Sequence, residues 1–128
     1  MGGAKGQGAM VAGPYVPDAG HLVKVDFEPS LGKEQAGRRP AIVLSPATYN
    51  AKTGLAVMAP ITNSQKDYPF EVKLPAAFKK VTGVILADHV KNLDWTVRNI
   101  EFLGEVPANV LTEVREKLRL LLGLGTND

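Results

Sequence analysis

Residues 33–40 carry the densest set of groups in this sequence that could act on a phosphodiester. A carboxylate, an amide and two guanidiniums lie directly before an apolar run, at Glu34, Gln35, Arg38 and Arg39. The planar fork of arginine donates two parallel, charge-assisted hydrogen bonds to a phosphate, and Gly37 allows the backbone to approach a ligand closely. The segment therefore indicates an anion-binding loop. The alternative is an exposed ion pair between Glu34 and an arginine, which is common and weak on protein surfaces.

Other kinds of catalytic chemistry find little support in the composition. The chain has no cysteine and only two histidines, His21 and His89, so thiolate nucleophiles, cysteine-bound zinc and histidine-rich metal sites are excluded. Gly32-Lys33 is followed by Glu34 and lacks the upstream glycine of a phosphate-binding P-loop. We therefore expect neither a metal nor a cofactor. His21 begins a predicted strand far from Glu34, so a structural role is expected for it.

Length and charge point to one soluble domain. The 128 residues are 45% apolar and 22% charged, enough for a single core, and the net charge of +2 requires any polyanion to bind a local patch. The longest apolar runs reach about seven residues, whereas a membrane-spanning helix needs ~20. Residues 1–13 contain five of the thirteen glycines and no secretory signal. We expect a disordered tail over 1–13, one domain over 14–123, a short tail over 124–128, and a cytoplasmic location without membrane contact.

Hydrophobic periodicity predicts a mainly β fold with helices, of the α+β class. Alternation or short apolar runs predict strands over 20–27, 41–44, 55–61, 70–74 and 83–87, with further strand structure over 95–106. The run 41–44 is typical of a central strand covered on both faces. Residues 47–54 are expected to form a turn, and 62–69 a polar loop. A helix is predicted from Pro107 to Leu122, ending at Gly123, with its apolar stripe at Leu111, Val114, Leu118, Leu121 and Leu122. Short strands, long loops and one terminal helix favour a small, curved antiparallel barrel.

Several motifs together resemble one known family. They are VDF at 25–27, EQAG at 34–37, RP at 39–40 and PIT at 60–62, accompanied by YNAKTG, YPFEV and GVILADHVKNLDW. Over about residues 15–123 the sequence resembles the MazF/PemK (Kid) family of toxin endoribonucleases. The resemblance implies an SH3-like barrel with appended helices. It also implies a homodimer with a shared groove, and an antitoxin protein whose acidic segment covers that groove.

The resemblance implies metal-free cleavage of single-stranded mRNA at short sequence motifs. The ribose 2′-hydroxyl attacks the adjacent phosphate and leaves a 2′,3′-cyclic phosphate and a 5′-hydroxyl. Arg39, at the family's arginine-proline motif, matches the main phosphate clamp and catalytic residue. Thr62 matches a threonine that holds a non-bridging oxygen or the attacking hydroxyl. Glu34 is a candidate general base that could equally read a base or orient an arginine.

The remaining candidates are RNA-binding residues in or beside the predicted loops: Gln35, Gly37, Arg38, Ser64, Gln65, Lys66, His89, Lys91 and Asn92. Such side chains can contact phosphates and the edges of unpaired bases, although polar loops are also simply solvated. Two positions depart from the family, because Arg38 stands where several relatives have histidine and Leu86 where some have arginine. The roles of Asp88 and His89 stay open.

A second functional class has the same fold. It is a non-catalytic, SH3-like module that binds nucleic acid or protein, such as a toxin that poisons DNA gyrase, since fold alone does not decide function. The joint presence of Glu34, Gln35, Arg39 and Thr62 favours the nuclease, because a binding module does not need that set.

Overall fold

The computed structural model describes residues 14–27 and 37–125. The expected tail 1–13, the last three residues of the expected tail 124–128, and Glu34 and Gln35 lie outside this part. The strands are β1 His21–Asp26, β2 Arg38–Val43, β3 Leu55–Thr62, β4 Glu71–Lys73, β5 Val84–Leu86, β6 Lys91–Asp94 and β7 Glu101–Glu105. The α-helices are α1 Ala47–Thr53 and α2 Ala108–Leu122, and short 3-10 turns cover η1 Ala87–His89 and η2 Trp95–Val97.

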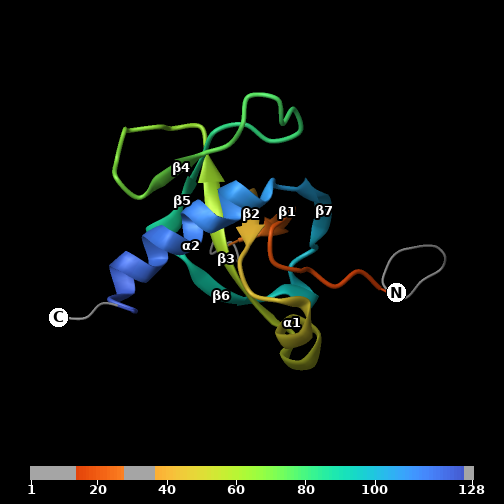
Figure 1. Ribbon diagram of the computed structural model, residues 1–128. Helices are drawn as coiled ribbons and strands as arrows, with labels where there is room; N and C mark the ends of the chain where they lie inside the picture. Colours follow the sequence, from red (N-terminus) through yellow and green to blue (C-terminus); the bar gives the residue numbers. More distant parts are fainter. Residues whose placement is uncertain (1–13, 28–36, 126–128) are drawn as a thin grey trace.

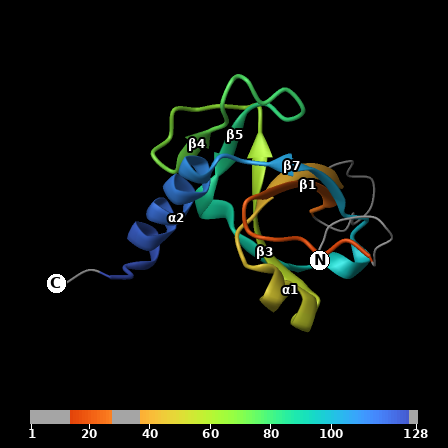
Figure 2. The same cartoon turned by 45° about the vertical axis from the view of Figure 1, so that its right-hand side comes forward.

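The strands form one curled, antiparallel sheet, as predicted. Its order is β4-β5-β3-β2-β1-β7, and β6 pairs with the first half of β3. Figure 2 shows β4 and β5 on one side of β3, and β1 and β7 on the other. Because β4 and β7 are the two ends of this path, the sheet is open rather than closed into a full barrel.

Pro60 lies inside β3 at a point where its missing amide hydrogen costs no hydrogen bond to a neighbouring strand. β3 pairs with β6 up to Met58 and with β5 from Ile61 onward, so Pro60 falls between the two partners on that side. Its register partner in β2 is Ala41. A proline is thus tolerated in a strand that is otherwise central, because no strand pairs with Pro60 on that side.

Both faces of the sheet carry a core, which explains why β2 is apolar without alternation. Leu22 and Ile42 face a first core that α2 covers, and α2 passes in front of the sheet in Figure 1. Val23, Val25 and Phe27 face a second core on the other side, together with Ala41, Val43, Ala56, Met58 and Leu93. The expected central strand with two covered faces is confirmed.

Helix α2 matches its prediction and ends where expected, but it begins one residue later, at Ala108. Pro107 occupies the position before the first helical residue, and Gly123 ends the helix in a left-handed conformation with φ 72°. Val110 and Val114 are buried, and Leu111 and Leu118 pack on the first core. The predicted stripe stops there, because Leu121 and Leu122 are 44% and 61% exposed. No helix of the described residues is long and apolar enough to cross a membrane.

The turn predicted over 47–54 was wrong, because these residues form α1. The side chain of Asn50 is fully buried; its amide donates to the carbonyls of Pro17 and Ser45, and its Oδ1 accepts from the Ser45 hydroxyl at 2.7 Å. Gly54 ends the helix with φ 75°. These tertiary contacts stabilise a helix that has too few turns to be stable alone.

The strand structure in residues 91–106 differs from the prediction, because it is divided between β6 and β7. β6 was missed, since Lys91 and Asn92 were expected in a loop, and the expected strand structure over 95–106 is confined to β7. The Asp94 carboxylate accepts a hydrogen bond from the Thr96 amide at 3.0 Å and starts η2. This local bond competes with continued strand pairing.

His21 lies in an aromatic cluster and has the structural role expected for it. Its Nδ1 accepts hydrogen bonds from the Tyr15 hydroxyl at 2.7 Å and from the Asp18 amide at 3.2 Å. Because Nδ1 accepts, the neutral ring carries its proton on Nε2. Burial lowers the pKa of His21 and outweighs the nearby carboxylates. The ring also packs edge-on against Phe102.

Candidate active site

Arg39 and Thr62 are brought to the same face of neighbouring strands. Arg39 was expected in a loop, but it lies in β2 opposite Val25 of β1, with its side chain exposed. β2 and β3 pair at Ala41 and Pro60, and Arg39 and Thr62 each lie two residues further on. Side chains two residues apart share a face, and continuing this register sets Arg39 opposite Thr62. Both therefore project from the side of the sheet that carries the second core.

The Thr62 hydroxyl has a defined orientation. Its Oγ1 accepts a hydrogen bond from the Ser64 amide at 3.1 Å. A hydroxyl that accepts in this way keeps its own proton for a second partner. Thr62 can thus donate to an oxygen placed between it and Arg39. Ser64, predicted to bind RNA, is held in the same turn.

Gly83 allows the end of β3 to approach the start of β5. Its φ is +117°, and a Cβ at this position would lie 2.2 Å from the Thr62 carbonyl oxygen. The next residue, Val84, pairs with Thr62. Only glycine accommodates both the backbone angle and the contact. The sequence alone gave no signal for this role.

Replacing Gly83 with alanine is expected to destabilise the fold by roughly 2 kcal/mol or more, because it adds a backbone clash to an unfavourable φ. Chemical denaturation measures the loss. Gly123→Ala is the matched control, since Gly123 has φ +72° with nothing within 4 Å of the added Cβ. The control should lose only about 1 kcal/mol. Equal losses in the two variants would contradict the close approach at Thr62.

The loop after β3 is held by two carboxylates. Glu71 of β4 accepts hydrogen bonds from the amides of Lys66 and Tyr68, at 2.9 and 3.4 Å. The amide group of Gln65 donates to Asp67 at 2.9 Å. The loop thus has a defined shape, and the exposed side chains of Gln65 and Lys66 remain at the end of β3 that carries Thr62.

Lys91 and Asn92 were both predicted to bind RNA from one loop. They are successive residues of β6, so their side chains lie on opposite faces of the sheet. Lys91 pairs with Met58 of the second core, so it shares the face of Arg39, and its Nζ lies 5.6 Å from the centre of the Phe27 ring. Asn92 is on the opposite face, where its amide donates to the Tyr49 hydroxyl at 3.1 Å. Lys91 therefore adds positive charge to the face that carries Arg39, whereas Asn92 faces α1.

Asp88 and His89 lie in η1, which packs against α2 and β3. The Tyr68 hydroxyl donates to Asp88 Oδ2 at 2.6 Å, and this bond raises the pKa of Tyr68. The exposed ring of His89 has its Nε2 at 3.9 Å from Asp88 Oδ1. Asp88 therefore anchors the loop that follows β3, and His89 lies at the surface beside it.

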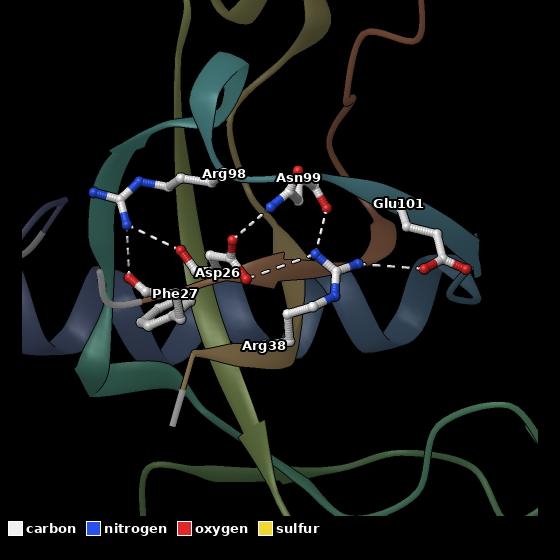
Figure 3. Close-up of polar contacts among 6 residues, drawn as sticks. All are labelled: Asp26, Phe27, Arg38, Arg98, Asn99 and Glu101. Atoms are coloured by element: carbon white, nitrogen blue, oxygen red, sulfur yellow. Dashed lines mark hydrogen bonds and ion pairs between the residues drawn. The ribbon is translucent and has the colours of Figure 1, made fainter. Parts of the chain in front are cut away.

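Gly37 and Arg38 stand at the start of β2. The Gly37 carbonyl accepts a hydrogen bond from the Phe27 amide at 2.8 Å, so β1 and β2 stay paired up to this point. The Arg38 guanidinium points away from the face of Arg39 and contacts Asp26, Asn99 and Glu101 (Figure 3). RNA would therefore have to compete with these three residues for the Arg38 guanidinium.

Aromatic side chains that could stack on RNA bases differ in exposure. Phe27 is 5% exposed and belongs to the second core. The Trp95 indole donates to the Asn50 carbonyl at 3.1 Å and packs on the same core. Tyr49 and Tyr68 are exposed. Over residues 14–27 and 37–125, no three histidine or acidic side chains gather as metal ligands would.

Comparisons with known proteins agree on one family. The model of the PemK-like, MazF-like toxin of type II toxin-antitoxin systems matches residues 18–122. The endoribonuclease toxin MazF of Escherichia coli K12 is 47% identical over 109 residues, which are 85% of this chain and 96% of that protein. A crystal structure of MazF from Deinococcus radiodurans (Form-I) has a TM-score of 0.79 and 59% identity, and covers 87% of this chain and 100% of that one. A MazE-MazF structure from the same organism (Form-II) has a TM-score of 0.78 and 55% identity, with 88% and 100% covered.

Proposed function

The chain belongs to the PemK-like, MazF-like toxin family of type II toxin-antitoxin systems, and we propose that it is an endoribonuclease that cleaves single-stranded mRNA at short sequence motifs without a metal ion. Its relatives in Escherichia coli are named endoribonucleases, among them MazF at 47% identity and PemK at 32%. The observation that carries the proposed mechanism is the placement of Arg39 and Thr62 on one face of β2 and β3. The pair provides a guanidinium and a hydroxyl proton for the oxygens of one phosphate.

In the proposed reaction, the RNA supplies its own nucleophile. The 2′-hydroxyl oxygen attacks the adjacent phosphorus, the bond from phosphorus to the 5′-oxygen breaks, and the products carry a 2′,3′-cyclic phosphate and a 5′-hydroxyl. Negative charge grows on the non-bridging oxygens of the pentacoordinate transition state. Arg39 stabilises that charge with paired donors, and Thr62 donates one further hydrogen bond.

Proton transfer needs a group other than Arg39. A guanidinium stays protonated in proteins and is a poor general base, so Arg39 acts as the electrostatic stabiliser. Glu34 is the proposed base, and it can equally read an RNA base or orient an arginine. Glu34 and Gln35 lie outside the described residues, so these two assignments rest on the motif at 34–37.

RNA is proposed to cross the face that carries Arg39. Lys91 adds positive charge there, Gly37 offers close approach beside Phe27, and Ser64, Gln65 and Lys66 lie at the adjoining end of β3. Backbone phosphates would bind the cations, and base edges would bind the amides and hydroxyls. His89 and Asn92 are proposed as more peripheral contacts, since each is turned away from that face or set apart from it. The predicted contact of Arg38 with RNA would have to displace its partners Asp26, Asn99 and Glu101.

An antitoxin protein is the proposed partner, because related MazF chains were crystallised as MazE-MazF. We also propose that two copies form a homodimer with a shared groove and act in the cytoplasm. These assignments rest on family membership. Gel filtration of the purified protein, alone and with its antitoxin, tests them: a monomer that stays monomeric with antitoxin would contradict both.

Cleavage of a long, defined RNA in EDTA tests the proposed function. Mapping the 5′ ends of the fragments should reveal cuts at one recurring short motif. Uniform cleavage, or activity that EDTA abolishes and magnesium restores, would contradict the proposal. Intact RNA at every protein concentration would favour the binding module instead.

Replacing Thr62 with alanine is expected to lower kcat by on the order of 10²-fold, with a much smaller change in the dissociation constant for RNA. The reason is that a hydroxyl aimed at the transition state affects turnover more than ground-state binding. Single-turnover kinetics and RNA binding measure the two quantities. Thr112→Ala, at an exposed position on α2, is the matched control and should leave both unchanged. A loss of affinity equal to the loss of rate would make Thr62 a simple binding residue.

A further inference from the structure

The start of β2 is fixed by a group of side chains on the face opposite Arg39. Arg38 Nη1 donates to the Asn99 carbonyl at 2.6 Å and lies 3.7 Å from Asp26 Oδ1. Arg38 Nη2 donates to Glu101 Oε1 at 3.3 Å. Asn99 Nδ2 in turn donates to Asp26 Oδ2 at 2.8 Å. We call Asp26, Arg38, Asn99 and Glu101 the Arg38 clamp; Figure 3 shows the guanidinium lying between Asp26 and Glu101.

Backbone pairing holds the first residues of β2 from the side of β1. β2 pairs with β3 only from Ala41 onward, so Arg38, Arg39 and Pro40 have β1 as their one paired neighbour. Pro40 contributes no amide hydrogen. The Phe27 amide bonds to the Gly37 carbonyl, so the alternation of an antiparallel ladder leaves the next pair, Asp26 and Arg38, without mutual backbone hydrogen bonds. The side chains of the clamp add a cross-strand connection at this pair.

The partners of Arg38 are themselves fixed. The Asp26 amide, turned away from β2, donates to the Arg98 carbonyl at 2.9 Å, and Arg98 Nη1 donates to the carbonyls of Asp26 and Phe27 at 2.9 and 3.1 Å. Asn99 adopts φ 53°, a left-handed conformation that asparagine tolerates better than most residues. This turn presents both the carbonyl and the amide of Asn99 to the clamp.

The charges of the clamp suit a positioning role better than an RNA contact. One guanidinium is set against two carboxylates, Asp26 and Glu101. A phosphate brought to Arg38 would therefore compete with both carboxylates for the guanidinium. Arg39 extends from the next residue to the other face, where Lys91 adds positive charge.

We infer that Arg38 is a positioning residue: its contacts with Asp26, Asn99 and Glu101 fix the first residues of β2 and so set the direction in which Arg39 meets the scissile phosphate. The inference rests on the proposed function of Arg39. Misplacing a catalytic group by about 1 Å can reduce a rate by up to ~10²-fold, so small movements of this strand matter.

Steady-state kinetics of Arg38→Gln, Asp26→Asn and the double variant test the inference. Each single variant should lower kcat by about tenfold, with KM changed less than about twofold. The double variant should be no slower than the slower single variant, because both changes break one interaction. Arg38→Lys keeps the charge but cannot reach three partners, so its kcat should fall between those of the wild type and Arg38→Gln. Lys52→Gln removes one charge from exposed α1 and should leave both constants unchanged.

A direct RNA contact predicts a different set of results. Arg38→Gln would then raise KM at constant kcat and reduce the slope of log affinity against log salt by about 0.7, while Asp26→Asn would not copy it. That outcome, or additive effects of the two substitutions, would overturn the inference. Thermal unfolding of each variant shows whether it is folded. If Asp26→Asn does not fold, the intermediate kcat expected of Arg38→Lys tests the inference in its place. Failure of the wild type to cleave, or full activity of Arg39→Ala, would instead overturn the proposed function.

Discussion

Replacing Arg39 with alanine is expected to lower the rate of RNA cleavage by about 10³-fold or more. Arg39 lies in β2 with an exposed side chain, on the face it shares with Thr62. Its removal takes away the charged, bidentate donor from a phosphate whose negative charge increases in the transition state. Rates measured under single-turnover conditions should show the loss at saturating enzyme, which separates it from weaker binding.

The same variant should remain folded. Replacing an exposed arginine usually changes the free energy of unfolding by no more than about 0.5 kcal/mol. Arg39→Lys should recover only part of the rate, because a single ammonium cannot donate two parallel bonds. Lys52→Ala, which removes a distant positive charge from α1, is the control for net charge. Turnover of Arg39→Ala close to that of the wild type would place the catalytic site elsewhere.

A single 2′-deoxy nucleotide on the 5′ side of the scissile phosphate is expected to block cleavage at that position. The proposed nucleophile is the 2′-hydroxyl of that nucleotide, and the deoxy substrate lacks the attacking atom. A 2′-O-methyl group should have the same effect. The rate at the modified position should fall to background, which denaturing gels of an end-labelled RNA can measure.

The control for this experiment is the same substitution one nucleotide further away. A distant 2′-deoxy group can weaken recognition, but it leaves the nucleophile in place. The control substrate should therefore be cut, with at most a change in KM. An undiminished rate with the deoxy nucleotide at the cut would show that another nucleophile, such as water, attacks the phosphorus.

The strands and α2 could be predicted because local pattern and tertiary packing agree there. Alternation in β1, the apolar run of β2 and the amphipathic pattern ending at Gly123 in α2 all match their burial. The short helix α1 depends on the burial of Asn50 by residues distant in sequence, and β6 depends on pairing with β3. A polar, short segment carries no periodic signal for either structure.

The candidate site was only partly accessible from sequence. The residue types of Arg39 and Thr62 could be recognised from motifs, but their shared face follows from the register of β2 and β3. The opposite orientations of Lys91 and Asn92 became evident only once β6 was found. Gly83 gave no signal, since its importance lies in the backbone contact with Thr62. The contacts of Arg38 with Asp26, Asn99 and Glu101 could not be foreseen, because strand pairing and distant turns bring these residues together.

The termini of the cleavage products test the mechanism most directly. Mass spectrometry of a short RNA cleaved in EDTA identifies both ends of the cut. Attack by the 2′-hydroxyl at the Arg39 and Thr62 face predicts a 2′,3′-cyclic phosphate on the upstream fragment and a 5′-hydroxyl on the downstream fragment. A 3′-hydroxyl paired with a 5′-phosphate would contradict the account, because water rather than the RNA would then have attacked the phosphorus.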